Sequence, residues 1–249
     1  MKNASPAGVS DRLDIRIAEK SFERVEGGRT CVLRDLAFSL EPGSFTCLIG
    51  PSGSGKTTTL RILLGLDTDF VGSVALPGHD ARIAAVFQEP RLLPWRTVEQ
   101  NVRLALPDGV TPDLDGLFDA LGLSDVRDNF PGELSLGLAR RVALARAFAI
   151  DPDVLLLDEP FVSLDEATAQ RLRGLLETLW LKRGVTVLMV THNLREAARL
   201  ADRLVLMAGQ PAHIVGEEEI DLARGARDRD AVEARLNRIM QRHPETVRI

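Results

Sequence analysis

One glycine-rich stretch of eight residues constrains the fold of this chain more than any other feature: Gly50-Pro51-Ser52-Gly53-Ser54-Gly55-Lys56-Thr57. The apolar run 45–49 before it is typical of a buried strand, and residues 58–64 after it have apolar side chains at helical spacing. Glycines between a strand and a helix let backbone N–H groups surround phosphate oxygens, and the helix N-terminus adds a positive potential. The stretch therefore predicts a nucleoside triphosphate site, where Lys56 contacts the β- and γ-phosphates and Thr57 binds Mg²⁺. The alternative is a glycine and serine turn that binds nothing.

Composition places the chain among soluble globular proteins. Of its 249 residues, 45% are hydrophobic and 27% are charged, which is ordinary for one large domain or two closely joined lobes. The net charge of −5 argues against a protein that wraps nucleic acid unaided. The first ten residues lack the apolar region of a secretory signal, and no run approaches the roughly 18 apolar residues of a membrane-spanning helix. We therefore expect a cytosolic protein that meets a membrane only through a partner.

The residues before the phosphate loop indicate an antiparallel sheet. Residues 13–17 alternate between apolar and polar, which predicts a half-buried strand that ends near Phe22, and residues 1–10 resemble a loose tail. The turn signal 26–29 and a second alternating segment, 32–40, complete a hairpin. Phe22 is a candidate platform for a nucleobase, because an aromatic ring face can stack on adenine. The alternative is a phenylalanine in the core of the sheet.

A loop with apolar residues is expected after two further strands. The strands are predicted at 71–76 and 82–87, and the second stops at Gln88. Two prolines in the segment 88–95 exclude regular structure there. The segment carries three apolar residues with no obvious core to enter: Leu92, Leu93 and Trp95. Such a loop indicates a docking surface, and the alternative is a loop folded back over its own domain.

Residues 89–149 are predicted to form a helical insertion between strands of the core. Thr97 and Gln100 have the spacing of a capping box at the start of one helix. Pro112 lies where the first turn of a further helix tolerates proline, and Gly122 ends that helix. The apolar stripe between them consists of Leu114, Leu117, Phe118 and Leu121.

A longer helix follows the segment 133–138. Its apolar face consists of Leu138, Val142, Ala145 and Ala149. Its arginines are expected to stay on the polar face: Arg140, Arg141 and Arg146. Ser135 caps this helix or nearly so, and the free N–H groups at the helix N-terminus offer a second anion site. The alternative is that Ser135 serves only as the cap.

Two buried strands later in the chain end in polar residues. Residues 154–157 are all apolar, as in a central parallel strand covered on both faces, and Asp158 and Glu159 follow directly. Ligands of such folds gather at the carboxyl ends of strands, although the two acids can also be structural. The run 185–191 is a further buried strand, and it ends at His192. This histidine is either a structural residue or a part of the site.

The remaining segments complete the expected core. Residues 163–165 open a helix that Gly184 ends. Residues 203–207 and 212–215 are predicted strands about a turn. The charged remainder of the chain contains a predicted helix near 231–240, whose role the sequence does not indicate.

Six of these motifs, in this order, resemble those of an ATP-binding cassette (ABC) ATPase. They resemble the Walker A loop (50–57), the Q-loop (Gln88), the signature motif (134–138), Walker B (154–159), the D-loop (163–165) and the switch histidine (His192). The resemblance covers residues 13–215. Residues 86–95 also look like the stretch found in ATPase subunits of nitrate, sulfonate and taurine importers.

The chain departs from the family pattern at three positions. The usual signature is Leu-Ser-Gly-Gly-Gln, but this chain has Leu136 and Leu138 at the third and fifth places. Phe22 stands where the family usually has a tyrosine that stacks on adenine. Ser135 and Gly137 keep the family residues, so the departures bear on affinity or coupling across a dimer rather than on the phosphate contacts themselves.

The resemblance implies an α/β fold of the P-loop NTPase ABC cassette type. Such a cassette has a mostly parallel core sheet, an antiparallel β apron and an inserted helical subdomain. The single domain 1–249 then divides into a nucleotide-binding core (11–88 and 150–216), the helical subdomain (89–149) and a C-terminal extension (217–249).

The resemblance also implies hydrolysis of ATP with bound Mg²⁺. Glu159 is implied as the general base or water-orienting group, together with His192, Gln88 and Lys56. The implied metal ligands are Thr57, Gln88 and Asp158. The residues implied to bind nucleotide are Phe22, Gly50, Pro51, Ser52, Gly53, Ser54, Gly55, Lys56, Thr57, Thr58, Ser135, Gly137 and Asp165.

The implied partners follow from the same family. Two copies sandwich two ATP molecules head to tail, and the homodimer binds integral membrane permease subunits and, indirectly, a secreted substrate-binding protein. The resemblance thus implies a cytoplasmic protein on the inner face of the cell membrane that energises uptake of a small anionic solute, with no nucleic acid partner. The alternatives are a soluble ABC ATPase outside transport, an ABC subunit for another substrate class, and a small-molecule kinase, which shares the phosphate loop.

Overall fold

The computed structural model describes residues 12–24, 27–78, 80–110 and 112–244. The strands are β1 (Leu13–Glu23), β2 (Arg29–Leu40), β3 (Phe45–Ile49), β4 (Val71–Ala75), β5 (Ile83–Val86), β6 (Val154–Asp158), β7 (Thr186–Thr191), β8 (Arg203–Ala208) and β9 (His213–Glu219). The helices are α1 (Lys56–Leu63), α2 (Val98–Arg103), α3 (Asp115–Leu121), α4 (Leu136–Ala149), α5 (Glu166–Arg183), α6 (Leu194–Leu200) and α7 (Arg229–Arg242). The tail expected at residues 1–10 lies outside the described residues.

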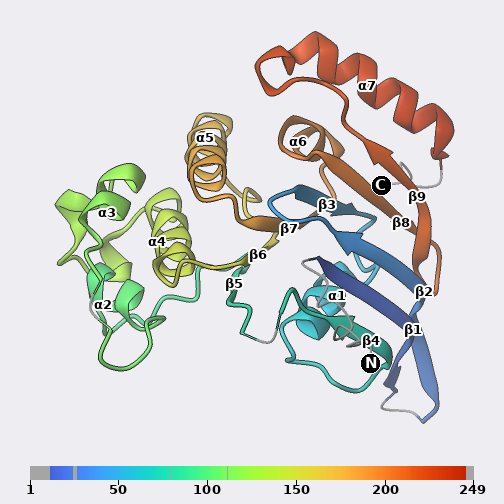
Figure 1. Cartoon of the computed structure of the whole chain (residues 1–249), viewed down its shortest axis with the longest axis horizontal. Helices are drawn as coiled ribbons and strands as arrows, with labels where there is room; N and C mark the ends of the chain where they lie inside the picture. Colours follow the sequence, from blue (N-terminus) through green and yellow to red (C-terminus); the bar gives the residue numbers. More distant parts are fainter. Residues whose placement is uncertain (1–11, 25–26, 79, 111, 245–249) are drawn as a thin grey trace, which may run out of the picture.

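The strands form two sheets (Figure 1). A three-stranded antiparallel sheet has the order β2-β1-β4, and a six-stranded sheet has the order β5-β6-β7-β3-β8-β9. Neighbouring strands from β5 to β8 in that order are parallel, and β9 is antiparallel to β8. The predicted mostly parallel core sheet with an antiparallel apron is therefore confirmed. Within the described ranges, no helix is both long enough and apolar enough to cross a membrane.

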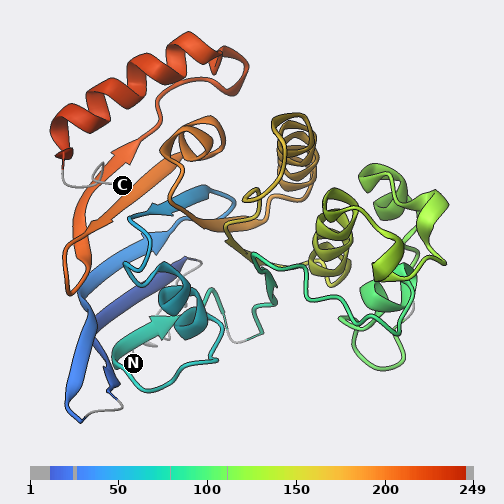
Figure 2. The ribbon, with the colours of Figure 1, turned by 180° about the vertical axis from the view of Figure 1, so that it is seen from behind.

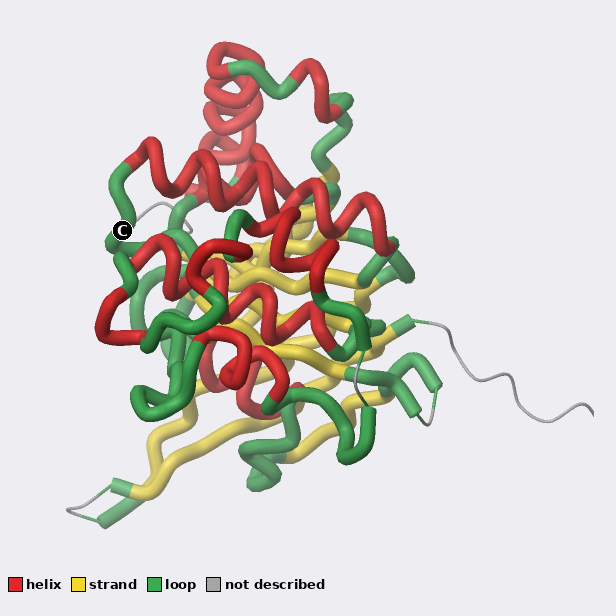
Figure 3. Tube along the Cα trace, turned by 90° about the vertical axis from the view of Figure 1, so that its left-hand side faces the viewer, coloured by secondary structure: helices red, strands yellow, loops and turns green. Residues whose placement is uncertain are grey.

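The central strands of the main sheet are buried because layers cover both faces. In β3, Phe45, Cys47 and Ile49 belong to one apolar cluster, whereas Leu48 belongs to another. The first cluster includes apolar residues of α4, α5, α6 and α7, and the second includes those of β1, β2 and α1. Figure 3 shows strands lying beneath a layer of helices. Burial on both faces explains why β3 is a continuous apolar run in the sequence rather than an alternating one.

The apron sheet packs on the second cluster through one face of β1. Leu13 and Ile15 point into this cluster, as the alternation in the sequence predicts. Farther along β1, the pairing with β2 shifts register between Lys20 and Ser21. The strand expected at 71–76 is β4, which pairs with β1 and so belongs to the apron.

The helices α2, α3 and α4 lie between β5 and β6 in the chain and to one side of the main sheet in space (Figures 1 and 2). The predicted capping box of α2 is confirmed, since Gln100 N donates to Thr97 Oγ1 at 3.3 Å and Thr97 N donates to Gln100 Oε1 at 3.1 Å. Gly122 ends α3 with a φ of 62°, as predicted.

The prediction that Pro112 lies in the first turn of α3 is wrong. The helix begins at Asp115. The carboxylate of Asp113 accepts the N–H of Asp115 at 2.9 Å, and a local bond of this kind favours a turn over a helix. Pro112 therefore precedes a turn, and the helix starts after it.

The C-terminal segment covers one side of the core. β9 runs to Glu219, past residue 216, where we expected the core to end. The predicted helix is α7, which packs against α6 (Figure 1). Its buried apolar residues join the first cluster: Val232, Leu236 and Ile239. The segment is thus part of the packed protein, not an appended tail.

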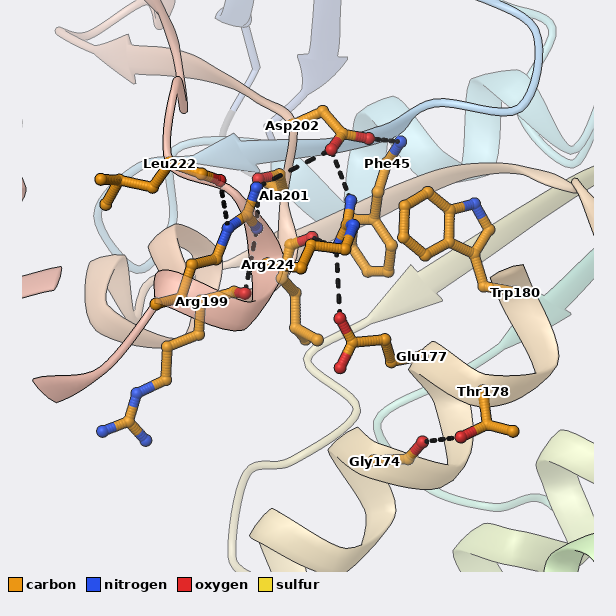
Figure 4. A network of polar contacts seen from close by, with 12 residues as sticks. Phe45, Gly174, Glu177, Thr178, Trp180, Arg199, Ala201, Asp202, Leu222 and Arg224 are labelled. Carbon is orange, nitrogen blue, oxygen red and sulfur yellow. Dashed lines mark hydrogen bonds and ion pairs between the residues drawn. The ribbon is translucent and has the colours of Figure 1, made fainter. Parts of the chain in front are cut away.

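Arg224 holds the C-terminal segment against the core (Figure 4). Its guanidinium carbon lies 4.0 Å from the ring centroid of Trp180, and the group pairs with Asp202 and with Glu177. Asp202 in turn accepts the N–H of Phe45 at 3.0 Å, at the start of β3. One side chain therefore connects the segment after β9 to α5 and to the central strand.

A second arginine, Arg227, ties the same segment to the end of α6. Its Nη1 donates to the carbonyls of Arg199 and Ala201 at 3.0 and 2.8 Å, and its Nε donates to the carbonyl of Leu222 at 3.0 Å. Burial and the charge of Arg224 lower the pKa of Arg227. The acceptors of these three bonds are backbone carbonyls, which every residue has. The sequence therefore does not show that Arg227 contacts the end of α6.

We expect Arg224→Met to lower the free energy of unfolding by about 1–3 kcal/mol, because the change leaves hydrogen-bonded charged partners without their donor. Chemical denaturation measures the effect. Arg195→Met removes a more exposed ion pair between α6 and α7, with Glu233, and is the matched control, expected to cost less than about 1 kcal/mol. Equal effects of the two changes would contradict the role of Arg224 as the anchor.

Candidate nucleotide-binding and catalytic site

The phosphate loop lies between β3 and α1, as predicted. Gly55 precedes α1 with a φ of 86°, and a Cβ there would meet Leu33 Cδ2 at 2.6 Å, so glycine is required. Gly55 offers no side chain to cap α1, and the first N–H groups of the helix are therefore available to an anion. The remaining predicted loop residues lead into this helix end or lie in its first turn: Gly50, Pro51, Ser52, Gly53, Ser54 and Thr58.

Lys56 and Ser54 are the buried polar side chains of the loop. Lys56 Nζ donates to two carbonyl groups of the loop at 2.8 and 2.9 Å, which leaves one of its three N–H groups. Burial lowers the pKa of Lys56, although the charges of Glu159 and Asp158 act in the opposite direction. The Ser54 hydroxyl is buried and has no partner among the described residues. A spare ammonium donor, an unpaired hydroxyl and free helix N–H groups together fit the oxygens of a triphosphate.

The expected metal ligands line one cavity of about 510 Å³: Thr57, Gln88 and Asp158. Thr57 Oγ1 donates to Asp158 Oδ1 at 3.4 Å. Burial raises the pKa of Asp158 and outweighs the hydrogen bond from Thr57, which lowers it. A hydroxyl, an amide and a carboxylate supply the oxygen ligands that Mg²⁺ prefers, and a cation would offset the cost of burying the Asp158 charge. The residues present therefore fit a bound Mg²⁺.

Glu159 and His192 lie next to each other at the ends of adjacent strands. Glu159 Oε1 is 3.1 Å from His192 Nδ1, and both residues line a second cavity of about 250 Å³. Glu159 has a φ of 44°, and its N–H donates to the carbonyl of Val190 in β7 at 3.0 Å. A left-handed backbone at a residue with a side chain persists only where surrounding contacts hold it. A fixed carboxylate beside a histidine and a cavity is suited to accept a proton from water.

Phe22 lies on β1 with 43% of its surface exposed, so the alternative of a core phenylalanine is wrong. Lys20 Nζ is 4.5 Å from the ring centroid. The ring keeps accessible surface for a nucleobase, and stacking on adenine stays a prediction.

The signature residues lie at the N-terminus of α4, and the phosphate loop leads into α1. In Figure 1, β5 and β6 lie between these two helices. Ser135 caps α4 by accepting the N–H of Leu138 at 3.3 Å. A Cβ on Gly137 would meet Thr168 Cγ2 at 2.6 Å, so this glycine allows α5 to approach. Asp165 caps α5 by accepting the N–H of Thr168 at 3.0 Å. Contact of Ser135, Gly137 or Asp165 with a nucleotide stays a prediction.

The arginines of α4 do not stay on a polar face, contrary to the prediction. Arg140 is buried and donates to carbonyl groups of the segment after β6. Arg146 donates to two carbonyl groups of the loop 88–95, both at 2.9 Å, and burial lowers its pKa. Arg141 is half-buried and reaches a carbonyl at the end of α3 at 3.4 Å. Helical periodicity predicts which face of α4 a residue lies on. It does not predict which backbone carbonyls a long arginine side chain reaches from that face.

The loop 88–95 is exposed only in part. Leu92 packs against the first apolar cluster, so the expectation that it has no core to enter is wrong, whereas Trp95 is 68% exposed. Asn101 of α2 is fully buried and organises the loop, because its Oδ1 accepts the N–H of Leu93 at 2.8 Å. Its Nδ2 donates to three carbonyl groups of the segment 93–97 at 3.0 to 3.2 Å. The sequence pattern did not indicate a role for Asn101, and the feature that could have shown it is an amide side chain next to Val102 on the buried side of α2.

The fold and the site together define the class of this protein. A phosphate loop between a strand and a helix, a mostly parallel core sheet and helices inserted between two of its strands are features of the phosphate-loop class of nucleotide-binding proteins.

Comparison with known proteins gives the family. Residues 33–162 match the family model for the ABC transporter. The chain is 43% identical over 248 residues to an aliphatic sulfonates import ATP-binding protein of Burkholderia cenocepacia (strain HI2424), covering 95% of this chain and 90% of that protein. It is 45% identical over 241 residues to a protein of the same description in Pseudomonas aeruginosa (strain UCBPP-PA14), covering 91% and 92%. The chain belongs to the ABC transporter family.

Solved structures agree with this result. A dimeric structure of a bacterial ABC transporter cassette has a TM-score of 0.71 and 27% identity, covering 85% of this chain and 100% of that one. The same cassette in a post-hydrolysis state bound to ADP and Pi has a TM-score of 0.70 and 26% identity, with the same coverage. The ABC cassette fold and the ATPase class that the sequence predicts are confirmed.

Proposed function

We propose that this chain is the ATP-hydrolysing subunit of an importer for a small anionic solute. An aliphatic sulfonate without an amino group is the first candidate, and nitrate and the aminosulfonate taurine are the others. The observation that carries the catalytic assignment is the placement of Glu159 beside His192, directly after the strand that ends in Asp158. The names of the similar proteins, which describe import of aliphatic sulfonates, support the solute class.

In this proposal the phosphate loop binds the triphosphate of ATP. Lys56 and the free N–H groups of α1 offset the phosphate charge. Thr57, Gln88 and Asp158 would hold Mg²⁺, which when bound neutralises charge on the β- and γ-phosphates. The exposed ring of Phe22 stacks on the adenine.

Glu159 then acts as the base. It accepts a proton from a water molecule while the water oxygen bonds to the γ-phosphorus and the bond to ADP breaks. His192 holds the Glu159 carboxylate through their 3.1 Å contact and reaches toward the same phosphate. The products are ADP and inorganic phosphate, and the proton passes from Glu159 to solvent.

Two copies of the chain are needed for a complete site in this proposal. The helix α4, which Ser135 caps, lies apart from α1 within one chain (Figure 1), and this supports the arrangement, as does the dimeric form of the similar solved cassette. The signature helix and Asp165 of one copy would complete the nucleotide site of the other. A twofold dimer makes the two sites equivalent.

The dimer would bind permease subunits on the inner face of the cell membrane and depend indirectly on a secreted substrate-binding protein. The core (11–88 and 150–216) would bind nucleotide, the helical subdomain (89–149) would carry the signature, and residues 217–249 would form the extension. A net charge of −5 supports the absence of a nucleic acid partner.

Deletion of the gene tests the transport role. We expect loss of growth on an aliphatic sulfonate as the only sulfur source and normal growth on sulfate. Purified protein should also release phosphate from MgATP without any added acceptor, which a small-molecule kinase would not do. Unchanged growth on the sulfonate, with loss of nitrate or taurine uptake, would reassign the solute, and unchanged uptake of all three would contradict the importer role.

We expect Trp95→Asp to abolish transport or membrane assembly while the ATPase rate of the purified protein stays within about twofold. The indole is exposed on the loop 88–95, where a charge would oppose burial against a partner. Uptake of the labelled solute and co-purification with the permease measure the effect. Leu181→Asp changes another exposed apolar side chain, 59% exposed on α5, and serves as the control. Normal transport by the Trp95 variant would reject the docking role.

A further inference from the structure

Arg140 connects the signature helix α4 to the backbone that carries Glu159. The residue is 3% exposed. Its Nη1 donates to the carbonyls of Glu159 and Pro160 at 3.2 and 2.6 Å, and its Nη2 donates to the carbonyl of Val162 at 2.8 Å. All three acceptors belong to the segment 159–163, which follows β6 and leads to the D-loop.

Backbone carbonyls hold this buried charge in place. Burial lowers the pKa of Arg140, and its Nε is buried without a partner in the described structure. Removing a guanidinium from water is unfavourable unless acceptors replace the lost hydration. The three carbonyls are those acceptors, so the position of the guanidinium and the shape of the segment 159–163 depend on each other.

The segment 159–163 needs such support because its backbone is strained at both ends. Glu159 has a φ of 44° and Ser163 has a φ of 63°, values uncommon for residues with side chains. The hydrogen bonds within and just after the segment are long: 3.3 Å from Val162 N to Glu159 O and 3.4 Å from Leu164 N to Phe161 O. The two shortest bonds from Arg140 are shorter than either of these. Arg140 therefore fixes the carbonyl side of the turn from which the Glu159 side chain reaches His192, and the 3.0 Å bond from the Glu159 N–H to the Val190 carbonyl holds its other side.

We propose that Arg140 is a positioning residue for ATP hydrolysis, which holds the Glu159 backbone and links it to the helix that Ser135 caps. The proposal rests on the assignment of Glu159 as the base. Arg140 lies roughly one helical turn into α4, which packs against β5 and α5. A shift of the α4 N-terminus on contact with an anion would therefore move the Glu159 backbone through the Arg140 guanidinium.

The first test compares two adjacent arginines in the purified full-length protein. Arg140→Met removes the three hydrogen bonds that Arg140 donates to the segment 159–163, and we expect kcat for MgATP to fall about 10- to 100-fold while the affinity for ATP changes less than about threefold. Arg140→Lys keeps the charge but not the planar fork, so we expect an intermediate kcat. Arg141→Met is the matched control, because Arg141 donates to a carbonyl at the end of α3 and, among the described residues, makes no hydrogen bond to the segment 159–163, and its kcat should stay within about twofold of the parent protein.

A double-mutant cycle with Glu159→Gln separates positioning from general damage to the fold. If Arg140 acts through the Glu159 carboxylate, Arg140→Met should lower kcat less than about threefold in the Glu159→Gln background. A structural defect alone would lower kcat by the same factor in both backgrounds. If Arg140→Met does not fold, Arg140→Lys takes its place in the cycle, with an expected loss of about three- to tenfold in the parent background alone.

The outcomes distinguish this proposal from the one on which it rests. Near-normal turnover by Glu159→Gln would overturn the assignment of the base. Slow turnover by Glu159→Gln together with a normal kcat for Arg140→Met and Arg140→Lys would overturn only the positioning role. Equal losses from the Arg140 change in both backgrounds would also overturn the positioning role.

Discussion

Glu159→Gln is expected to lower ATP turnover about a hundredfold or more while ATP binding persists. The amide keeps the shape of the side chain and a contact with His192, but it cannot take the proton from water, and loss of a positioned base costs about 10²–10⁴ in rate. The bond from Arg140 is made to the backbone carbonyl of Glu159, so the change leaves it in place. Release of phosphate at steady state measures turnover, and equilibrium binding of labelled ATP measures affinity.

The same variant tests the need for a second copy. Without hydrolysis, ATP stays bound, and size-exclusion chromatography in MgATP should show a dimer. Glu41→Gln, which changes a side chain that is 60% exposed in the loop before β3, is the matched control and should behave as the parent protein does. Rapid hydrolysis by the Glu159 variant would contradict its role as the base, and an ATP-loaded form that elutes as a monomer would contradict the shared site.

Lys56→Met is expected to reduce kcat/KM for ATP about 10²–10³-fold, which is the range for removing one preorganised donor from a developing anionic charge. Methionine fills similar space, but it has no charge for the phosphates. It also cannot bond to the two loop carbonyls that Lys56 contacts at 2.8 and 2.9 Å. Initial rates over a range of MgATP concentrations give kcat and KM separately.

The loop contacts of Lys56 require a second measurement. Thermal unfolding of the nucleotide-free variant shows how much the carbonyl bonds stabilise the empty loop. Lys182→Met, at an exposed position near the end of α5, is the control and should leave both the kinetics and the unfolding temperature close to those of the parent protein. If only the unfolding temperature of the Lys56 variant falls and its KM for ATP is unchanged, Lys56 has a structural role and does not bind phosphate.

The sequence predicted the features that depend on local pattern and on strand order. The capping residue Thr97 and the terminating glycines Gly122 and Gly184 were readable because each satisfies backbone groups within a few residues. Glu159 and His192 each follow a buried apolar run, and β6 and β7 are parallel neighbours. The carboxyl ends of such strands meet at one edge, which is why the two side chains come within 3.1 Å.

Contacts made by the end of a long side chain could not be predicted from the sequence. Arg140 occupies a helical position that looks polar, and its acceptors are carbonyl groups, which every residue has. Alternation counted from residue 13 places Phe22 on the exposed side, where it lies, but it does not show that the adjacent Lys20 and Ser21 are both buried, because the register of β1 shifts between them. Pro112 was placed in a helix because the sequence pattern did not show that Asp113 would accept an N–H group and form a turn first.

The two tryptophans of this chain occupy opposite environments, and this makes its intrinsic fluorescence informative. Trp95 is 68% exposed on the loop 88–95, whereas Trp180 is 4% exposed beneath Arg224. A water-soluble quencher such as iodide should therefore reach the first indole and not the second. If iodide no longer quenches Trp95, a partner has bound at that loop. If the emission of Trp180 shifts to longer wavelength, the C-terminal segment has been released. Neither measurement needs an added label.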